Sequence, residues 1–182
     1  MVGATRIIPV GDEALGGSNS FGPIPTGLKL AMTVFDIEET VTGAQAKVPN
    51  KPQFIFTGKV TEDYAFDYVD PETHLTSKQN ALGREIRYNY IPLFSEAGNA
   101  WALVAFAEAV GWPVTKNADG KPEVAVPVNR KEVLGTPFIG KVGQSQGADG
   151  KIYNRVNGYQ KIGKGGGGKA AEAAPKKSWK DL

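Results

Sequence analysis

The chain has 182 residues and a formal net charge of +2, which suits one domain with extensions rather than a strongly basic body. It contains no cysteine, which excludes disulfides and Cys-ligated zinc. No apolar run reaches 18 residues, which excludes a membrane-spanning helix by length. The first residues lack the apolar region of a signal peptide, so we expect a cytoplasmic protein.

Composition divides the chain into three parts. Residues 1–27 are rich in Gly, Pro and Ser and predict an irregular arm, which Phe21 or Ile24 would pin to the core. Residues 28–162 carry the strand and helix patterns of one domain. Residues 163–182 predict a flexible tail that holds five Lys and two acidic residues. The domain itself is therefore close to neutral, and any nucleic-acid site in it must be a local groove.

Two strands are predicted in the first part of the domain, at residues 28–42 and 51–62. Their side chains alternate between two faces, as a strand requires. Gly58 lies inside the second strand and indicates a bulge or a sharp bend. One face is expected to hold Leu28, Leu30, Met32 and Val34 in the first strand, and Phe54, Phe56, Gly58 and Val60 in the second.

A long loop is predicted at residues 63–83, and loops of this length are more often functional than neutral. Tyr64, Phe66 and Tyr68 alternate in its first part, which could extend the preceding strand. A third strand follows at residues 84–94. Alternation in this strand places Ile86, Tyr88 and Tyr90 on one side and Arg87, Asn89 and Ile91 on the other.

The one convincing helix is predicted at residues 98–112, where Ala and Leu dominate. Asn99 is expected to cap its start, and Gly111 is expected to end it in a left-handed conformation. After a second long loop at 113–131, in which Val124 to Val128 could form a short edge strand, two strands are predicted at 132–143 and 151–162. A polar turn that ends at Asp149-Gly150 joins these two strands.

Five strands with a helix between the third and the fourth is the order of an OB-fold, a five-stranded Greek-key barrel. The length of the first strand and Gly58 both favour the bending that closes a barrel. Other small barrels share part of this pattern. The predicted fold is therefore mainly β and OB-fold-like, followed by a disordered C-terminal tail.

The chain also resembles a family of small bacteriophage proteins, some of them described as single-stranded-DNA-binding proteins. The resemblance runs from Pro25 to Ile162, and its most distinctive segments are residues 134–142 and 153–159. Residues 24–30 and 102–111 also carry it. It implies an OB-like barrel that binds single-stranded DNA, and it supplies no certified binding residues.

The tail invites a comparison with bacterial single-stranded-DNA-binding proteins, whose acidic tail recruits partners through an apolar tip. This tail keeps the spacer and an apolar tip at Trp179 and Leu182, but it is basic. Replication or recombination proteins bound through these two residues are therefore the expected partners only by analogy. Oligomer formation is left open.

Aromatic and basic residues interleave in three segments of the domain. Single-strand binders need this mixture, because bases stack on rings while Lys or Arg contacts phosphates. The alternative is that the rings are strand-forming core residues, which we favour for Phe54 and Phe56, and that the cations lie on a solvated face. The candidate nucleic-acid-binding residues are Lys59, Tyr64, Tyr68, Arg84, Arg87, Tyr88, Tyr90, Lys141, Tyr153, Arg155, Tyr159 and Lys161.

Motifs for catalysis or cofactors are weak in this sequence. Residues 163–169 have P-loop spacing but lack the following Ser or Thr. Asp63, Asp67, Asp70 and Glu72 match no EF-hand loop, and the sole histidine, His74, has no defined partner for a triad. We therefore expect no enzyme activity, no metal and no cofactor.

These observations favour a phage single-stranded-DNA-binding protein that tolerates many sequences and acts in DNA replication or recombination. The rival hypothesis is a non-catalytic protein-interaction accessory module, which binds a host or phage enzyme through the barrel or through residues 178–182. A small hydrolase or nuclease is a weaker third option. The sequence does not separate DNA from RNA as the ligand.

Overall fold

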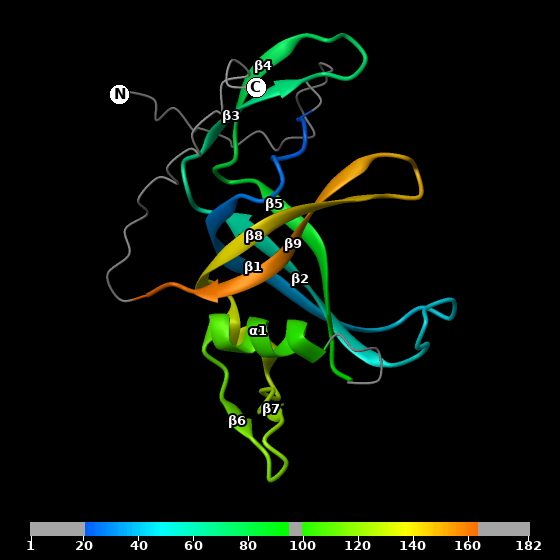
Figure 1. Ribbon diagram of the computed structural model, residues 1–182, viewed down its shortest axis with the longest axis vertical. Helices are drawn as coiled ribbons and strands as arrows, with labels where there is room; N and C mark the ends of the chain where they lie inside the picture. Colours follow the sequence, from blue (N-terminus) through cyan, green and yellow to red (C-terminus); the bar gives the residue numbers. More distant parts are fainter. Residues whose placement is uncertain (1–20, 95–99, 164–182) are drawn as a thin grey trace, which may run out of the picture.

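The computed structural model describes residues 21–94 and 100–163 as a mainly β structure with one α-helix in that part of the chain. Five antiparallel strands form the main sheet in the order β5-β2-β1-β8-β9 (Figure 1). These strands are β1 (Lys29–Val41), β2 (Pro52–Val60), β5 (Glu85–Pro92), β8 (Pro137–Gln146) and β9 (Ile152–Lys161).

Two small hairpins and a short 3-10 turn complete the fold. The hairpin of β3 (Ala65–Val69) and β4 (Thr76–Asn80) projects from one end of the main sheet (Figure 1). At the opposite end, the hairpin of β6 (Val114–Lys116) and β7 (Pro122–Val124) projects beyond the helix. The 3-10 turn η1 (Arg130–Val133) leads into β8.

The helix α1 (Ala100–Val110) covers one end of the main sheet and packs most closely on β9 (Figure 1). Gly111 follows it with φ of +84°, which confirms the predicted left-handed end, because glycine has no Cβ to oppose that conformation. The predicted cap at Asn99 lies outside the described residues. No helix in the described ranges is long and apolar enough to span a membrane.

The core forms where the predicted apolar faces of β1 and β2 meet α1. Leu30, Met32 and Val34 are buried, as are Phe54, Phe56 and Val60, which confirms both predicted faces. Six rings stack edge-to-face or tilted, with centroids 4.9 to 6.4 Å apart, and each such pair adds about 0.5–1.5 kcal/mol beyond area burial. We call this cluster the aromatic core: Phe54, Phe56, Phe106, Trp112, Phe138 and Tyr159.

The predicted irregularity at Gly58 is confirmed, and it occurs on both neighbouring strands. On the β1 side the pairing jumps from Val34–Gly58 to Asp36–Thr57, so Phe35 is an extra residue. On the β5 side the pairing shifts between Phe56 and Gly58. Such bulges bend and twist the strands that carry them.

Two predicted loops are wrong, because each contains a hairpin. Residues 63–83 fold into β3 and β4, whose turn is fixed by the Asp70 carboxylate accepting backbone N–H bonds from Glu72 and Thr73 at 2.9 and 2.8 Å. Residues 113–131 contain β6 and β7. The fourth predicted strand begins at Pro137 instead of 132, because η1 occupies the residues before it.

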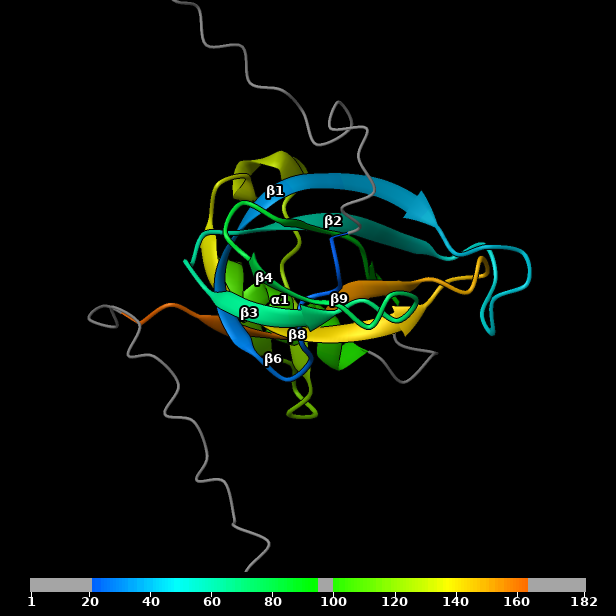
Figure 2. The ribbon, with the colours of Figure 1, turned by 90° about the horizontal axis from the view of Figure 1, so that it is seen from above.

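The main sheet curls, but it is not closed into a barrel. Its two terminal strands, β5 and β9, are joined by no backbone ladder in the described residues. In the view of Figure 2 the strands arch around a common interior, and the β1–β2 and β8–β9 connections extend to the same side. We call the unpaired boundary between β5 and β9 the seam.

Candidate nucleic-acid interface in the open seam

A bulge in β5 decides which of its side chains face the seam. Ile86 pairs with Gly58 and Asn89 pairs with Phe56, so two residues of β5 stand opposite the single residue between those partners. One of the two, Tyr88, has φ of +58°, a conformation that costs a non-glycine residue about 1–2 kcal/mol.

The bulge makes the predicted alternation of the third strand wrong. Arg87, Tyr88 and Tyr90 are exposed, whereas Asn89 is 3% exposed and faces the interior. Ile86 and Ile91 are buried as well. The extra residue shifts the alternation by one position, which turns two successive side chains, Arg87 and Tyr88, toward solvent.

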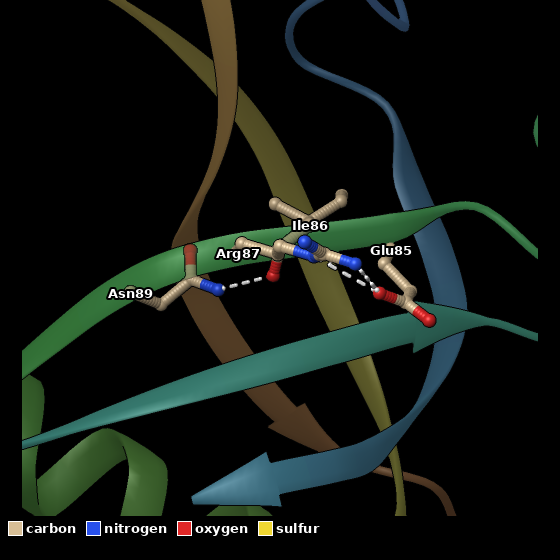
Figure 3. A network of polar contacts seen from close by, with 4 residues as sticks. All are labelled: Glu85, Ile86, Arg87 and Asn89. Atoms are coloured by element: carbon tan, nitrogen blue, oxygen red, sulfur yellow. Dashed lines mark hydrogen bonds and ion pairs between the residues drawn. The ribbon is translucent and has the colours of Figure 1, made fainter. Parts of the chain in front are cut away.

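Asn89 bridges β5 and β9 in place of a backbone ladder. Its Nδ2 donates to the carbonyls of Ile86 and Phe56 at 2.7 and 3.0 Å, and its Oδ1 accepts from the Val156 N–H at 2.7 Å. Figure 3 shows the first of these bonds and the exposed Glu85–Arg87 pair on the same strand. One buried amide thus makes three hydrogen bonds to backbone groups at the bulge and the seam.

Next to Asn89, the first half of β5 and the first half of β9 border a groove with a volume of about 1150 Å³. We call it the seam groove. It is lined by residues 21–24, 82–88 and 151–155, together with Asn80. Four of the lining side chains are cationic and one is acidic. The domain is nearly neutral, so the sequence predicts that any nucleic-acid site in it is a local groove. A local cationic groove agrees with that prediction.

Two exposed tyrosines face the seam groove from its two strands, with a guanidinium between them. The Arg155 Cζ lies 6.0 Å from the ring centroid of Tyr88 and 5.7 Å from that of Tyr153. Its Nη1 donates to the carbonyls of Asn154 and Arg87 at 2.9 and 3.4 Å. These contacts fix two ring faces and a positive charge in one place, as single-strand binding by stacking requires.

The Tyr153 ring is held at the groove by the turn between β8 and β9. Its hydroxyl donates to Asp149 Oδ2 at 2.7 Å. This hydrogen bond lowers the pKa of the Asp149 carboxyl and raises the pKa of the Tyr153 hydroxyl, because the bond needs the carboxylate as acceptor and the phenol as donor. Tyr153 therefore remains a neutral ring throughout the physiological pH range.

Arg84 is held too firmly to be a free phosphate contact. Its two terminal nitrogens donate to the Gly22 carbonyl and to Gln79 Oε1, both at 2.7 Å. Its guanidinium also lies 5.0 Å from the ring centroids of Phe21 and Phe66. We interpret Arg84 as a residue that positions the arm at the edge of the groove.

The arm itself is the part of the site that sequence reasoning missed. Ile24 is buried, as one of the two predicted pins, and its backbone exchanges two 2.8 Å bonds with the Asn154 amide. Phe21, the other predicted pin, is 63% exposed and contacts Arg84. Asn154 lies 130 residues along the chain from Ile24, so no local pattern could signal the contact.

Tyr159 differs from its prediction. It packs in the aromatic core, its hydroxyl donates to the Val156 carbonyl at 3.0 Å, and burial raises its pKa above the ordinary value. Phe106 of α1 contacts its ring, and Tyr159 lines the cleft beside Lys29 and Lys141 instead of the seam groove. We therefore omit Tyr159 from the seam groove.

The remaining sequence candidates are dispersed. Tyr64 and Tyr68 pack against the core from the β3 side, and Lys59 lies 4.8 Å over the Phe35 ring. Tyr90 is exposed further along β5. Outside the groove lie Lys141 and Lys161, on β8 and at the end of β9; Trp179 and Leu182 lie outside the described residues.

The four acidic residues Asp63, Asp67, Asp70 and Glu72 do not form a metal site in the described structure. Within the described ranges, no group of three or more His, Cys, Asp or Glu side chains is placed to hold a metal ion. Asp70 is engaged in the turn of the β3–β4 hairpin, and His74 closes that turn with φ of +57°. Asp70 therefore has a turn-forming role, and Asp63 accepts a hydrogen bond from Asn80 Nδ2 at 2.6 Å.

Fold and groove together define a curled five-stranded antiparallel protein with a cationic, tyrosine-lined seam. Comparison of the chain with protein-family models, with curated proteins and with solved structures finds no match in any of the three. The function must therefore be argued from the groove itself.

Proposed function

We propose that this chain is a non-catalytic single-stranded-DNA-binding protein that tolerates many sequences and acts in phage DNA replication or recombination. Its fold would be an OB-fold-like Greek-key barrel, in which the Asn89 bridge completes the closure between β5 and β9. The strand order β5-β2-β1-β8-β9 supports this interpretation, as does the resemblance to phage proteins. OB-folds bind oligonucleotides on the face of their second and third strands and with the loop between the fourth and fifth, and the seam groove is lined by β5, the third strand of the main sheet, and by the end of the β8–β9 connection.

The observation that carries the proposal is the strained and exposed Tyr88. Its side chain is 51% exposed although its backbone is left-handed. Packing alone gives no reason for a tyrosine at such a position, where glycine would be unstrained. Strain of this kind gathers at functional sites, and here it presents a ring beside Arg155 and opposite Tyr153.

Chemically, the groove suits an unpaired strand better than a duplex. Tyr88 and Tyr153 offer two ring faces to successive bases, and stacking contributes about 1–3 kcal/mol per base. Arg87, Lys151 and Arg155 supply cations for the phosphates along the same path. A base offers its ring face for stacking on such a side chain only when it is not stacked within a duplex.

Anisotropy of a labelled oligo(dT) tests the proposal most directly. We expect binding at about 50 mM salt, a steep loss of affinity as salt rises because counterions are released, and much weaker binding of duplex of the same length. Tyr88→Ala and Tyr153→Ala should each weaken binding by about 1–3 kcal/mol.

Trp101→Ala is the matched control, because Trp101 is a ring of similar exposure on α1, away from the groove. Its removal should leave the affinity unchanged. If the unaltered protein does not bind oligo(dT) at low salt, or if all three variants bind equally, the proposed function is wrong.

A protein-interaction module is the second candidate, and one observation favours it. Val69 and Leu75 flank the turn of the projecting β3–β4 hairpin and are 55% and 70% exposed. Exposed apolar side chains at the tip of a hairpin are typical of a contact with another protein. Val69→Ser with Leu75→Ser would abolish such a contact and leave oligo(dT) binding intact.

A further inference from the structure

Two lysines face each other across the ladder of β1 and β8. Lys29 pairs with Lys141 in register, and both side chains are exposed. Like charges directly opposite each other on a sheet are destabilising. Neither amine has a carboxylate within ion-pair distance in the described part of the chain. Among the described residues, no carboxylate therefore compensates this concentration of charge.

The pair borders a cleft with a volume of about 300 Å³ on the far half of β9, which we call the lysine cleft. Gln160 lines it, and its Oε1 accepts from Lys29 Nζ at 3.4 Å. Gly158 stands opposite Lys141, and a Cβ there would come within 3.4 Å of the Lys141 Cβ. A side chain at position 158 would thus begin in van der Waals contact with the Lys141 stem, and glycine leaves that space open.

We propose that the lysine cleft is a second phosphate-binding site, which holds the backbone of the same strand that stacks in the seam groove. This inference rests on the proposed function. Two ammonium groups with no ion-pair partner among the described residues, and a neighbouring side-chain amide, suit a phosphate diester. Phosphate neutralisation by lysine is strong, independent of base identity and sensitive to salt.

The placement of the two sites on one strand supports a continuous path. Arg155 lines the seam groove and Gly158 lines the lysine cleft. They are three residues apart on β9, which corresponds to about 10 Å of strand. An oligonucleotide long enough to leave the groove along β9 therefore reaches the lysines, whereas a very short one does not.

The test compares two lengths of oligo(dT), about 2 and about 20 nucleotides, because two stacked nucleotides cover only about 7 Å of strand, less than the distance between the two sites. The double variant Lys29→Gln with Lys141→Gln should bind the longer oligonucleotide about tenfold or more weakly at about 50 mM salt. Its slope of log affinity against log salt should be shallower by about 1.4, which is two lost contacts on a single strand. Binding of the shorter oligonucleotide should be unchanged.

Lys116→Gln with Lys121→Gln is the control for net charge, because both lysines are exposed on the β6–β7 hairpin. If the two double variants behave alike, or if the cleft variant weakens both lengths equally, the second site does not exist while the proposed function stands. If the unaltered protein binds neither length, both proposals are wrong.

A free phosphate ligand is the competing source of the same chemistry. Amide chemical shifts of Lys141 and Gly158 distinguish the two sources, on titration with inorganic phosphate and with the longer oligonucleotide. Shifts that saturate with the oligonucleotide at its binding stoichiometry support the proposal. Saturation by inorganic phosphate alone would overturn it.

Discussion

The two tyrosines of β9 have opposite environments although they lie six residues apart on one strand. Tyr159 is enclosed by Phe56, Phe106 and Phe138, and Tyr153 stands exposed at the seam groove. The pKa of both hydroxyls is raised, by burial in the first and by the hydrogen bond to Asp149 in the second. The comparison shows that one strand serves a core at one end and a surface site at the other.

What separates the two regions is the element that covers them. The helix α1 seals the Tyr159 end, since its side chains complete the aromatic core. At the Tyr153 end the sheet stays open, and the arm and the β5 bulge border a groove instead of filling it. Stability should therefore depend mainly on the aromatic core, and stacking of bases on the seam groove.

The largest expected effect is in the aromatic core. Phe56 is fully buried and contacts three other rings. Phe56→Ala should lower the free energy of unfolding by about 3–5 kcal/mol, because it removes a buried ring and leaves a cavity. Urea denaturation measures the loss. Tyr153→Ala, the control at the open end, should lower it by less than about 1 kcal/mol; comparable losses would mean that the two regions do not differ.

The second largest effect should come from the bridge between the regions. Asn89→Ala removes three buried hydrogen bonds to backbone groups, and with partial access of water to the seam we expect a loss of about 3 kcal/mol. Hydrogen exchange of the Val156 amide, which donates to Asn89, should accelerate. Asn80→Ala removes exposed bonds only and should change stability by less than about 1 kcal/mol; an equal effect would contradict the bridging role.

Sequence patterns predicted the aromatic core better than the seam groove. Alternation found the apolar faces of β1 and β2, because each residue there reports its own local environment. It failed in β5, because the positive φ of Tyr88 and the buried amide of Asn89 are fixed by contacts with β2 and β9. Tyr153 and Tyr159 look alike in sequence, since the rings that cover Tyr159 come from β2, α1 and β8, far away along the chain.

A titration to alkaline pH sharpens the comparison between the two tyrosines. Burial raises the pKa of Tyr159 above its ordinary value of 10.0, so the folded state keeps a proton that the unfolded state loses. This contribution to stability is complete below pH of about 10 and falls as pH rises, by at most about 1.4 kcal/mol per pH unit. Urea denaturation at pH 9 to 11 measures the fall.

Tyr159→Phe should flatten that fall, because no buried hydroxyl remains to ionise. Tyr153→Phe should leave it nearly unchanged, because the Tyr153 hydroxyl is exposed and its hydrogen bond is worth little in water. A flattening of equal size in the two variants would show that both hydroxyls are in the same environment, contrary to the structure.

The smallest expected effect is the most informative about function, because it separates backbone strain from packing at two matched positions. Tyr88 and Tyr90 lie two residues apart on β5 and are 51% and 52% exposed, and of the two only Tyr88 has a positive φ. Tyr88→Gly should raise the free energy of unfolding by up to about 1 kcal/mol, since glycine adopts that conformation without strain. Tyr90→Gly should lower it by about as much, since glycine weakens an ordinary strand position. If Tyr88→Gly is more stable and also binds oligo(dT) more weakly, the strained backbone serves to place the ring for binding. If Tyr88→Gly is less stable, the ring contributes to packing, and the main observation behind the proposed groove is lost.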